Sequence, residues 1–118
     1  MNKAKQKTIK MIRRAKRVRS RIRGTAERPR LSVKRSLKHI YVQLINDEAS
    51  VTIASASDKD VKTDGLKPVD IAKEVGKLIA TKALEAGVKE SVFDRGANRY
   101  QGRVAALADG AREQGLKI

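Results

Sequence analysis

Residues 31–56 read LSVKRSLKHIYVQLINDEASVTIASA, and apolar and polar side chains alternate along three parts of this stretch. The alternating parts are residues 31–35, 39–45 and 51–56. Alternation with this period is typical of β-strands that have one covered and one open face. Because only short polar connections separate the three strands, we expect an antiparallel meander. Its open face would carry Ser32, Lys34, Tyr41, Gln43 and Thr52.

Two helices and a fourth strand are predicted after the meander. Pro68 is a favourable first-turn residue, and apolar side chains recur at helical spacing from there to Gly87. Residues 89–94 are predicted as a short strand, and residues 102–114 as a helix with a stripe of small apolar residues. The order β-β-β-α-β-α needs a crossover before the last strand, which would then lie parallel to the first. We therefore expect an α/β domain (α+β-like) of two layers, with a mixed sheet and both helices on one face.

Positive charge is concentrated near the amino terminus of the chain. The 118 residues carry a net charge of +15. Residues 1–30 hold thirteen Lys or Arg and one acid, Glu27, so only three net charges remain for the other residues. This division predicts a basic N-terminal extension, residues 1–28, followed by an α/β RNA-binding domain, residues 29–118. Within the extension, residues 3–23 show helical periodicity.

Gly24 is the predicted C-terminal cap of this basic helix, and residues 24–29 are the predicted hinge. A cationic arm attracts a polyanion, either nucleic acid or an acidic membrane surface. Helices that lie on membranes bury Trp, Phe or Leu, whereas the apolar stripe of this arm is thin and contains none of them. Nucleic acid is therefore the favoured partner. The alternative is a solvated tail that only keeps the protein soluble.

Composition excludes several other classes of site. The chain has no cysteine and a single histidine, His39, so thiolate metal sites, disulfides and histidine-built zinc sites are not expected. No apolar run approaches the roughly twenty residues of a membrane span, and no secretory signal is recognisable. We expect a cytoplasmic protein without a cofactor.

The first motif that suggests a binding site is FDRGANRYQGRV, residues 93–104, between the last strand and the last helix. Its arginines can hold phosphate oxygens in a bidentate manner, and its glycines let the backbone approach a ligand. Tyr100 offers a stacking face for an unpaired base. The alternative is a tight turn in which Asp94 pairs with Arg95 or caps a neighbour.

The second motif is the predicted hairpin at residues 34–39, followed by Tyr41, which pairs hydrogen-bond donors with an aromatic ring. An ordinary solvated turn is the alternative, and His39 is interpreted as a donor rather than a catalytic base. The two motifs and the arm give the candidate RNA-binding residues, which are Lys7, Lys10, Arg13, Arg14, Lys16, Arg17, Arg19, Arg21, Arg23, Arg30, Lys34, Arg35, Ser36, Lys38, His39, Tyr41, Arg95, Asn98, Arg99, Tyr100, Gln101 and Arg103.

Catalysis has little support in this sequence. A metal-dependent nuclease needs carboxylates that converge on a cation, and nothing in the sequence fixes the spacing of the five candidate carboxylates. These are Asp47, Asp58, Asp60, Asp64 and Asp94. No nucleophile–base pattern and no phosphate-cradling loop is present. We predict that the protein is not an enzyme and has no small-molecule substrate.

An ordered series of motifs runs through essentially the whole chain. The motifs are residues 28–33, 35–36, 38–43, 55–57, 93–96, 100, 102–104, 106–109, 111–113 and 115–116. In this order they resemble the L18 family of bacterial large-subunit ribosomal proteins. The resemblance implies a structural protein that binds 5S rRNA and helps attach it to large-subunit rRNA in the central protuberance. It also implies a ribosome-bound location beside neighbouring ribosomal proteins, no membrane partner, and a mixed-sheet α/β domain with a basic leader.

The chain departs from the family pattern at three places. Ala97 and Asn98 stand where Gly-Tyr is usual, Gln101 where a His is common, and Lys34 where an aromatic residue is frequent. We therefore do not carry a stacking role onto Asn98, although Asn and Gln can still hydrogen-bond RNA. The alternative to the ribosomal role is a nonspecific nucleic-acid-binding or chaperone protein, for which the arm would suffice.

Overall fold

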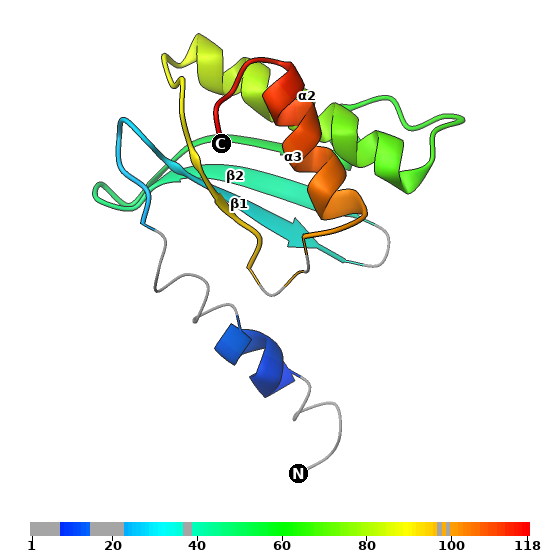
Figure 1. Ribbon diagram of the computed structural model, residues 1–118, viewed down its shortest axis with the longest axis horizontal. Helices are drawn as coiled ribbons and strands as arrows, with labels where there is room; N and C mark the ends of the chain where they lie inside the picture. Colours follow the sequence, from blue (N-terminus) through cyan, green and yellow to red (C-terminus); the bar gives the residue numbers. More distant parts are fainter. Residues whose placement is uncertain (1–7, 15–22, 37–38, 97, 99) are drawn as a thin grey trace.

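A computed structural model describes residues 8–14, 23–36, 39–96, 98 and 100–118 (Figure 1). Residues 8–14 are helical. The elements of the globular part are β1 (Arg30–Arg35), β2 (Ile40–Asn46), β3 (Val51–Ser57), the 3₁₀ helix η1 (Asp58–Asp60), α2 (Pro68–Glu85), β4 (Val92–Asp94) and α3 (Arg103–Glu113). The predicted order of strands and helices is confirmed. The 3₁₀ helix η1 was not predicted; its capping box between Ser57 and Asp60 lies in the predicted polar connector.

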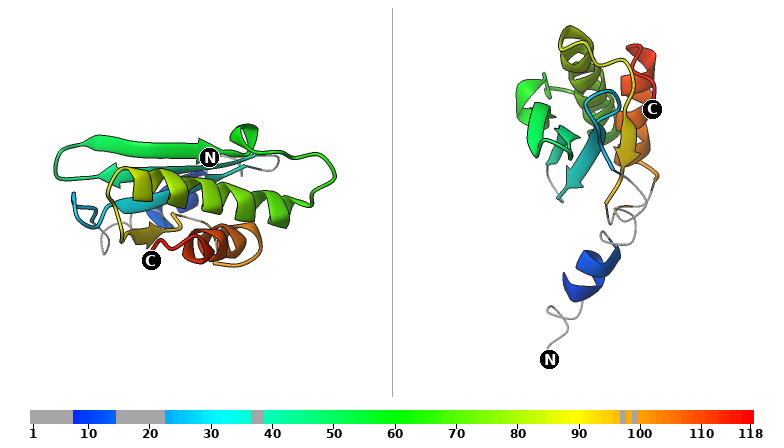
Figure 2. Two further views of the ribbon diagram at one scale, coloured as in Figure 1. Left: turned by 90° about the horizontal axis from the view of Figure 1, so that it is seen from above. Right: turned by 90° about the vertical axis from the view of Figure 1, so that its left-hand side faces the viewer.

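The four strands form one mixed sheet in the order β3-β2-β1-β4. The meander of β1, β2 and β3 is antiparallel, whereas β4 lies parallel to β1, with Arg30 opposite Val92 and Ser32 opposite Asp94. Both α2 and α3 cover the same face of the sheet (Figures 1 and 2). The predicted two-layer architecture is therefore confirmed.

The core lies between this covered face and the two helices. Alternate residues of the strands, such as Leu31, Val42 and Leu44, are fully buried there. The predicted helical stripes also face the core, because Val75 and Ile79 of α2 and their counterparts on α3 are fully buried. The side chains that alternate along the strands and those that recur at helical spacing thus pack into one apolar core.

The helices cross in close contact because glycines occupy the crossing. A Cβ atom at Gly76 would overlap the carbonyl oxygen of Leu107, and one at Gly110 would overlap that of Lys73. The two glycines act reciprocally, each admitting the backbone of the other helix. Near the end of α2, Gly87 has a φ of +83° and its N–H bonds to the Leu84 carbonyl oxygen, as predicted for a helix stop.

The predicted basic helix, residues 3–23, is described only at 8–14 and at Arg23, which is not helical. The remainder lies outside the described residues. Gly24 is not among the glycines with positive φ, so a left-handed cap does not explain it. A Cβ atom at Gly24 would overlap the Arg30 nitrogen and the Ile45 carbonyl oxygen. The glycine is needed because the chain passes close to β1 and β2 at this point.

Candidate nucleic-acid interface

The two motifs singled out in the sequence meet at one edge of the sheet. Because β1 and β4 are parallel, the turn after β1 and the loop after β4 leave the sheet at the same end. Arg103, at the start of α3, donates from Nη2 to the carbonyl oxygen of Ser36 at 3.1 Å. This bond joins segments that are 67 residues apart in sequence. We call the combined surface of residues 34–36, 39, 95–96, 98 and 100–103 the loop edge.

Beside the loop edge, Arg30 holds two carboxylates in a buried network. Its Nε and Nη2 donate to the two oxygens of Asp47 at 3.0 and 3.1 Å, and its Nη1 donates to Asp94 Oδ2 at 2.7 Å. Only 5% of Arg30 is exposed. The hydrogen bond to Asp47 is the main cause of the raised pKa of Arg30, followed by the opposing effect of burial and then by the bond to Asp94. The guanidinium is therefore firmly cationic.

The same network positions the segments around it. Asp94 Oδ1 accepts the Gly96 N–H at 2.9 Å, which fixes the first turn of the loop after β4. Asp47 Oδ2 accepts the Gly24 N–H at 2.7 Å, and the Asp47 N–H donates to the Gly24 carbonyl oxygen. The predicted hinge therefore begins at a point that is bound to the β2–β3 turn. Arg30 thus positions both the base of the arm and the loop edge.

Side chains in the described part of the loop after β4 form hydrogen bonds and a ring contact nearby. Arg95 Nη1 donates to the Asn98 carbonyl oxygen, and Asn98 Nδ2 donates to the Arg95 carbonyl oxygen, both at 3.0 Å. The Tyr100 ring meets Phe93 edge to face, with centroids 5.6 Å apart, and its hydroxyl accepts from Arg112 Nη1 at 2.8 Å. Since 44% of Tyr100 remains exposed, the ring is held in place yet accessible.

The hairpin residues of the loop edge also form hydrogen bonds, one of them to the neighbouring element η1. The His39 N–H donates to Ser36 Oγ at 3.1 Å, which closes the turn between β1 and β2. A hydrogen bond of 2.8 Å joins His39 Nδ1 to Asp58 Oδ2 of η1, while 60% of the histidine side chain stays exposed. The predicted role of His39 as a hydrogen-bonding residue agrees with this contact.

Known proteins are similar to this one over nearly the full chain. The family described as Ribosomal L18 of archaea, bacteria, mitochondria and chloroplast matches residues 5–118. Large ribosomal subunit protein uL18 of Desulfitobacterium hafniense is 53% identical over 117 residues, covering 96% of this chain and 95% of the relative. The uL18 proteins of Staphylococcus epidermidis (54% identical; 91% of each chain) and Halalkalibacterium halodurans (56% identical; 95% of this chain, 98% of the relative) are similar too.

The chain belongs to the uL18 family. The family is one of structural ribosomal proteins and not of enzymes. Membership therefore places this protein in the large ribosomal subunit, with ribosomal RNA and ribosomal proteins as its partners, and confirms the predicted resemblance.

Most of the candidate RNA-binding residues of this uL18 chain that the structure describes are accessible. Lys10, Arg13 and Arg14 are exposed on the helix of the arm, and Arg23 is exposed beside its base. The loop edge contributes exposed Lys34, Arg35, Ser36, His39, Arg95, Tyr100 and Gln101, with Asn98 and Arg103 half-buried; Tyr41 on β2 is half-buried as well. Arg30 differs, because it is buried in ion pairs. Seven candidates lie outside the described residues, namely Lys7, Lys16, Arg17, Arg19, Arg21, Lys38 and Arg99.

Sequence reasoning missed three residues that shape this surface of the uL18 chain. Asp47 and Asp58 were considered only as candidate metal ligands, whereas the structure pairs them with Arg30 and His39. Arg112 was not a candidate, although it bonds to Tyr100 and pairs with Asp109 at 3.5 Å. The spacing from Arg103 gave no signal for Arg112, because nine residues along a helix place two side chains on opposite sides of it. No local signal existed for the two aspartates either, because their partners lie on other elements.

Three further observations concern the alternatives. Within the described ranges, no group of three or more His, Asp or Glu side chains is arranged to hold a metal ion. Asp94 pairs with Arg30 through Oδ2 and not with Arg95. Its Oδ1 accepts the Gly96 N–H, so the part of the alternative in which Asp94 caps a neighbour is confirmed. No helix of the described part is long and apolar enough to cross a membrane.

Proposed function

We propose that this protein binds 5S rRNA and helps attach it to large-subunit rRNA in the central protuberance. The bond between Arg103 and Ser36 is the observation that carries the proposal, because it makes one surface from two separate motifs. A surface built from two loops can match the shape of a folded RNA, whereas bare charge cannot select one RNA over another.

The proposed site has two parts with different physical roles. The basic extension, residues 1–28, supplies phosphate attraction that does not depend on sequence. The loop edge supplies registration, through Arg35, Arg95, Tyr100 and Arg103. With roughly six to ten phosphate contacts in total, affinity would fall about a thousandfold or more between low and moderate salt.

A competition experiment tests this proposal. The full chain would be titrated with labelled 5S rRNA at moderate salt, against unlabelled 5S rRNA, transfer RNA and duplex DNA. We expect 5S rRNA to compete at the lowest concentration, because only it fits the loop edge. Equal competition by all three nucleic acids would contradict the proposal and favour a nonspecific nucleic-acid-binding or chaperone protein.

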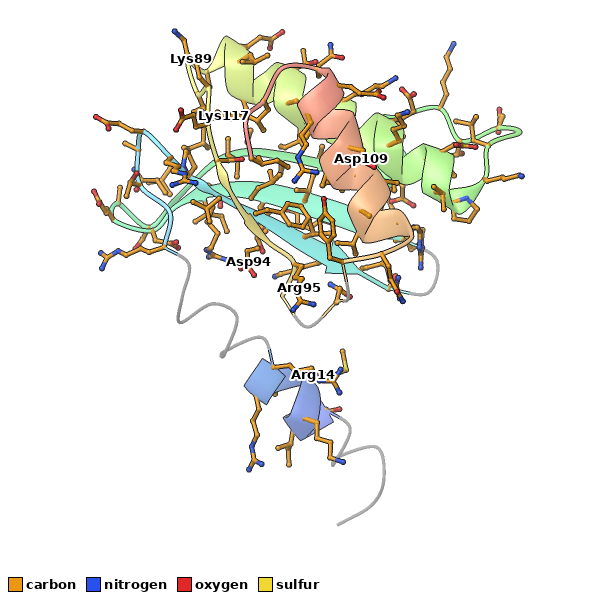
Figure 3. All side chains as sticks on the ribbon, in the orientation of Figure 1. Arg14, Lys89, Asp94, Arg95, Asp109 and Lys117 are labelled. Atoms are coloured by element: carbon orange, nitrogen blue, oxygen red, sulfur yellow. The ribbon has the colours of Figure 1, made fainter. Side chains whose placement is uncertain are left out.

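A matched pair of variants locates the selectivity. Arg103→Ala removes the bond to Ser36, and Lys89→Ala removes an equal charge at the opposite end of β4 (Figure 3). We expect Arg103→Ala to lower the preference for 5S rRNA over transfer RNA about tenfold, while Lys89→Ala leaves that preference unchanged. The same loss in both variants would assign the preference to charge alone.

A further inference from the structure

The chain contains two Asp-Gly dipeptides, Asp64–Gly65 and Asp109–Gly110, and the fold places them in different surroundings. The first lies in the connector between η1 and α2, which projects from the domain (Figure 1). The second lies within α3 (Figure 3). An aspartate that precedes glycine can react with its own backbone, because glycine has no side chain to shield its amide nitrogen. Whether this reaction takes place depends on what the fold allows each dipeptide to do.

Asp64 and Gly65 occupy the centre of an open turn. The Leu66 N–H donates to the Thr63 carbonyl oxygen at 3.2 Å, and Gly65 has a φ of +73°. All residues from 62 to 70 are exposed, and a Cβ atom added to Gly65 would meet no atom within 4 Å. Within the described part of the chain, neither the Asp64 carboxyl group nor the Gly65 N–H has a hydrogen-bond partner. The two groups that would react are therefore unrestrained by the rest of the domain.

The second dipeptide is held in place by its helix. Gly110 is buried in α3, and a Cβ atom there would overlap the Lys73 carbonyl oxygen of α2. In an α-helix each interior N–H donates to the carbonyl oxygen four residues earlier, so the Gly110 nitrogen is occupied. The Asp109 carboxylate pairs with Arg112 Nη1 at 3.5 Å. A reaction between Asp109 and Gly110 would require α3 to open locally, which costs free energy.

We propose that Asp64–Gly65 is a site of covalent self-modification, at which the folded protein converts aspartate to isoaspartate. The Gly65 nitrogen attacks Cγ of the protonated Asp64 carboxyl group, and the new N–Cγ bond closes a succinimide ring. The carboxyl hydroxyl leaves with the amide proton as one water molecule. A second water then opens the ring at either carbonyl carbon, which restores aspartate or gives isoaspartate. One water is lost and one is gained, so the reaction needs no oxidant and no other substrate.

The modification is independent of the proposed function. In isoaspartate the main chain runs through Cγ, which lengthens the connector by one carbon atom and leaves a free α-carboxylate. The connector lies outside the loop edge and contains none of the candidate RNA-binding residues. The inference therefore goes beyond RNA binding, and it stands or fails separately from it.

The test uses the full chain in a mildly acidic buffer, where a fraction of aspartate carboxyl groups is protonated and circular dichroism shows the folded domain. After incubation, isoaspartate is quantified with an isoaspartate-specific methyltransferase and located by proteolysis and mass spectrometry. We expect at least about tenfold more isoaspartate at Asp64 than at Asp109, because only the second reaction requires α3 to open. In urea both dipeptides should react at similar rates, since no fold distinguishes them.

Asp64→Glu is the matched variant, because it keeps the charge and the exposed position but would have to close a larger and less favourable ring. It should abolish the isoaspartate signal of the folded chain. The inference is overturned if the folded original chain forms no isoaspartate at Asp64, or if it forms equal amounts at Asp64 and Asp109. An Asp64→Glu chain that retains the full signal would likewise overturn it, since the reaction would then lie elsewhere.

Discussion

At the scale of single residues, Arg30 shows how a cation can be placed inside a small domain. Its guanidinium is planar, and its fork of donors reaches Asp47 and Asp94 at once. The raised pKa of Arg30 follows first from the bond to Asp47. The stability that this shift reflects is present at every pH below the ordinary arginine pKa and is lost only as pH rises through the higher folded-state value. Arg30 therefore adds no pH dependence near neutrality.

Arg30→Lys should destabilise the protein by about 2 kcal/mol. The lysine keeps the charge, but its ammonium cannot reproduce the three hydrogen bonds that Arg30 donates to Asp47 and Asp94. At least one carboxylate oxygen would therefore lose its donor. Urea unfolding followed by circular dichroism measures the loss. Arg28→Lys, an exposed arginine two residues earlier, is the control and should unfold at the original midpoint. Equal midpoints for the two variants would show that the network does not stabilise the fold.

At the scale of elements, the crossing of α2 and α3 depends on two glycines. Gly76 and Gly110 each face the backbone of the opposite helix. Glycine lowers helix stability by about 1 kcal/mol relative to alanine, so its presence within both helices needs a packing reason. The close crossing provides that reason, since it brings Val75 and Leu107 into one core.

Gly76→Ala should therefore destabilise the protein by about 1–3 kcal/mol, although alanine is the better helix former. The added methyl group would overlap the Leu107 carbonyl oxygen and push the helices apart. Thermal or urea unfolding measures the effect. Glu85→Ala, at the exposed end of α2, should change stability by less than about 0.5 kcal/mol. A Gly76→Ala protein as stable as the original would mean that the helices are not in close contact.

At the scale of the whole molecule, most of the net positive charge lies in the N-terminal arm and not in the folded domain. Residues 1–23 contain eleven Lys or Arg and no acid, whereas the domain beyond them is close to neutral. Among the described residues, the base of the arm is bound to the domain by the hydrogen bond from the Gly24 N–H to Asp47 Oδ2. A truncation after residue 23 therefore removes charge and preserves that anchor.

Removal of residues 1–23 should weaken 5S rRNA binding and flatten its dependence on salt, because fewer counterions are released. The preference for 5S rRNA over transfer RNA should persist, since the loop edge is intact. Binding measured across a series of salt concentrations tests both points, and circular dichroism should show a folded domain. If the shortened protein binds 5S rRNA as tightly as the full chain, the arm has no role in attraction.

The elements of this fold were predictable because their signals are local. Alternation from residue 31 to residue 56 predicted the meander, and Pro68 and Gly87 predicted the limits of α2. Net charge identified the basic extension and its class of partner. These properties depend on neighbours along the chain, so a single sequence contains them in full.

The composition of the site required the three-dimensional structure. Arg30 belongs to an arginine-rich segment, yet it is buried, because β1 places it between a turn and a loop that lie 17 and 64 residues away. Arg103 reaches Ser36 only because β4 pairs in parallel with β1, and Ser32 faces Gln43 only through the register of β1 with β2. Local periodicity specifies which face a side chain occupies. Which distant residues share that face depends on strand pairing and helix packing, which form only when the whole chain folds.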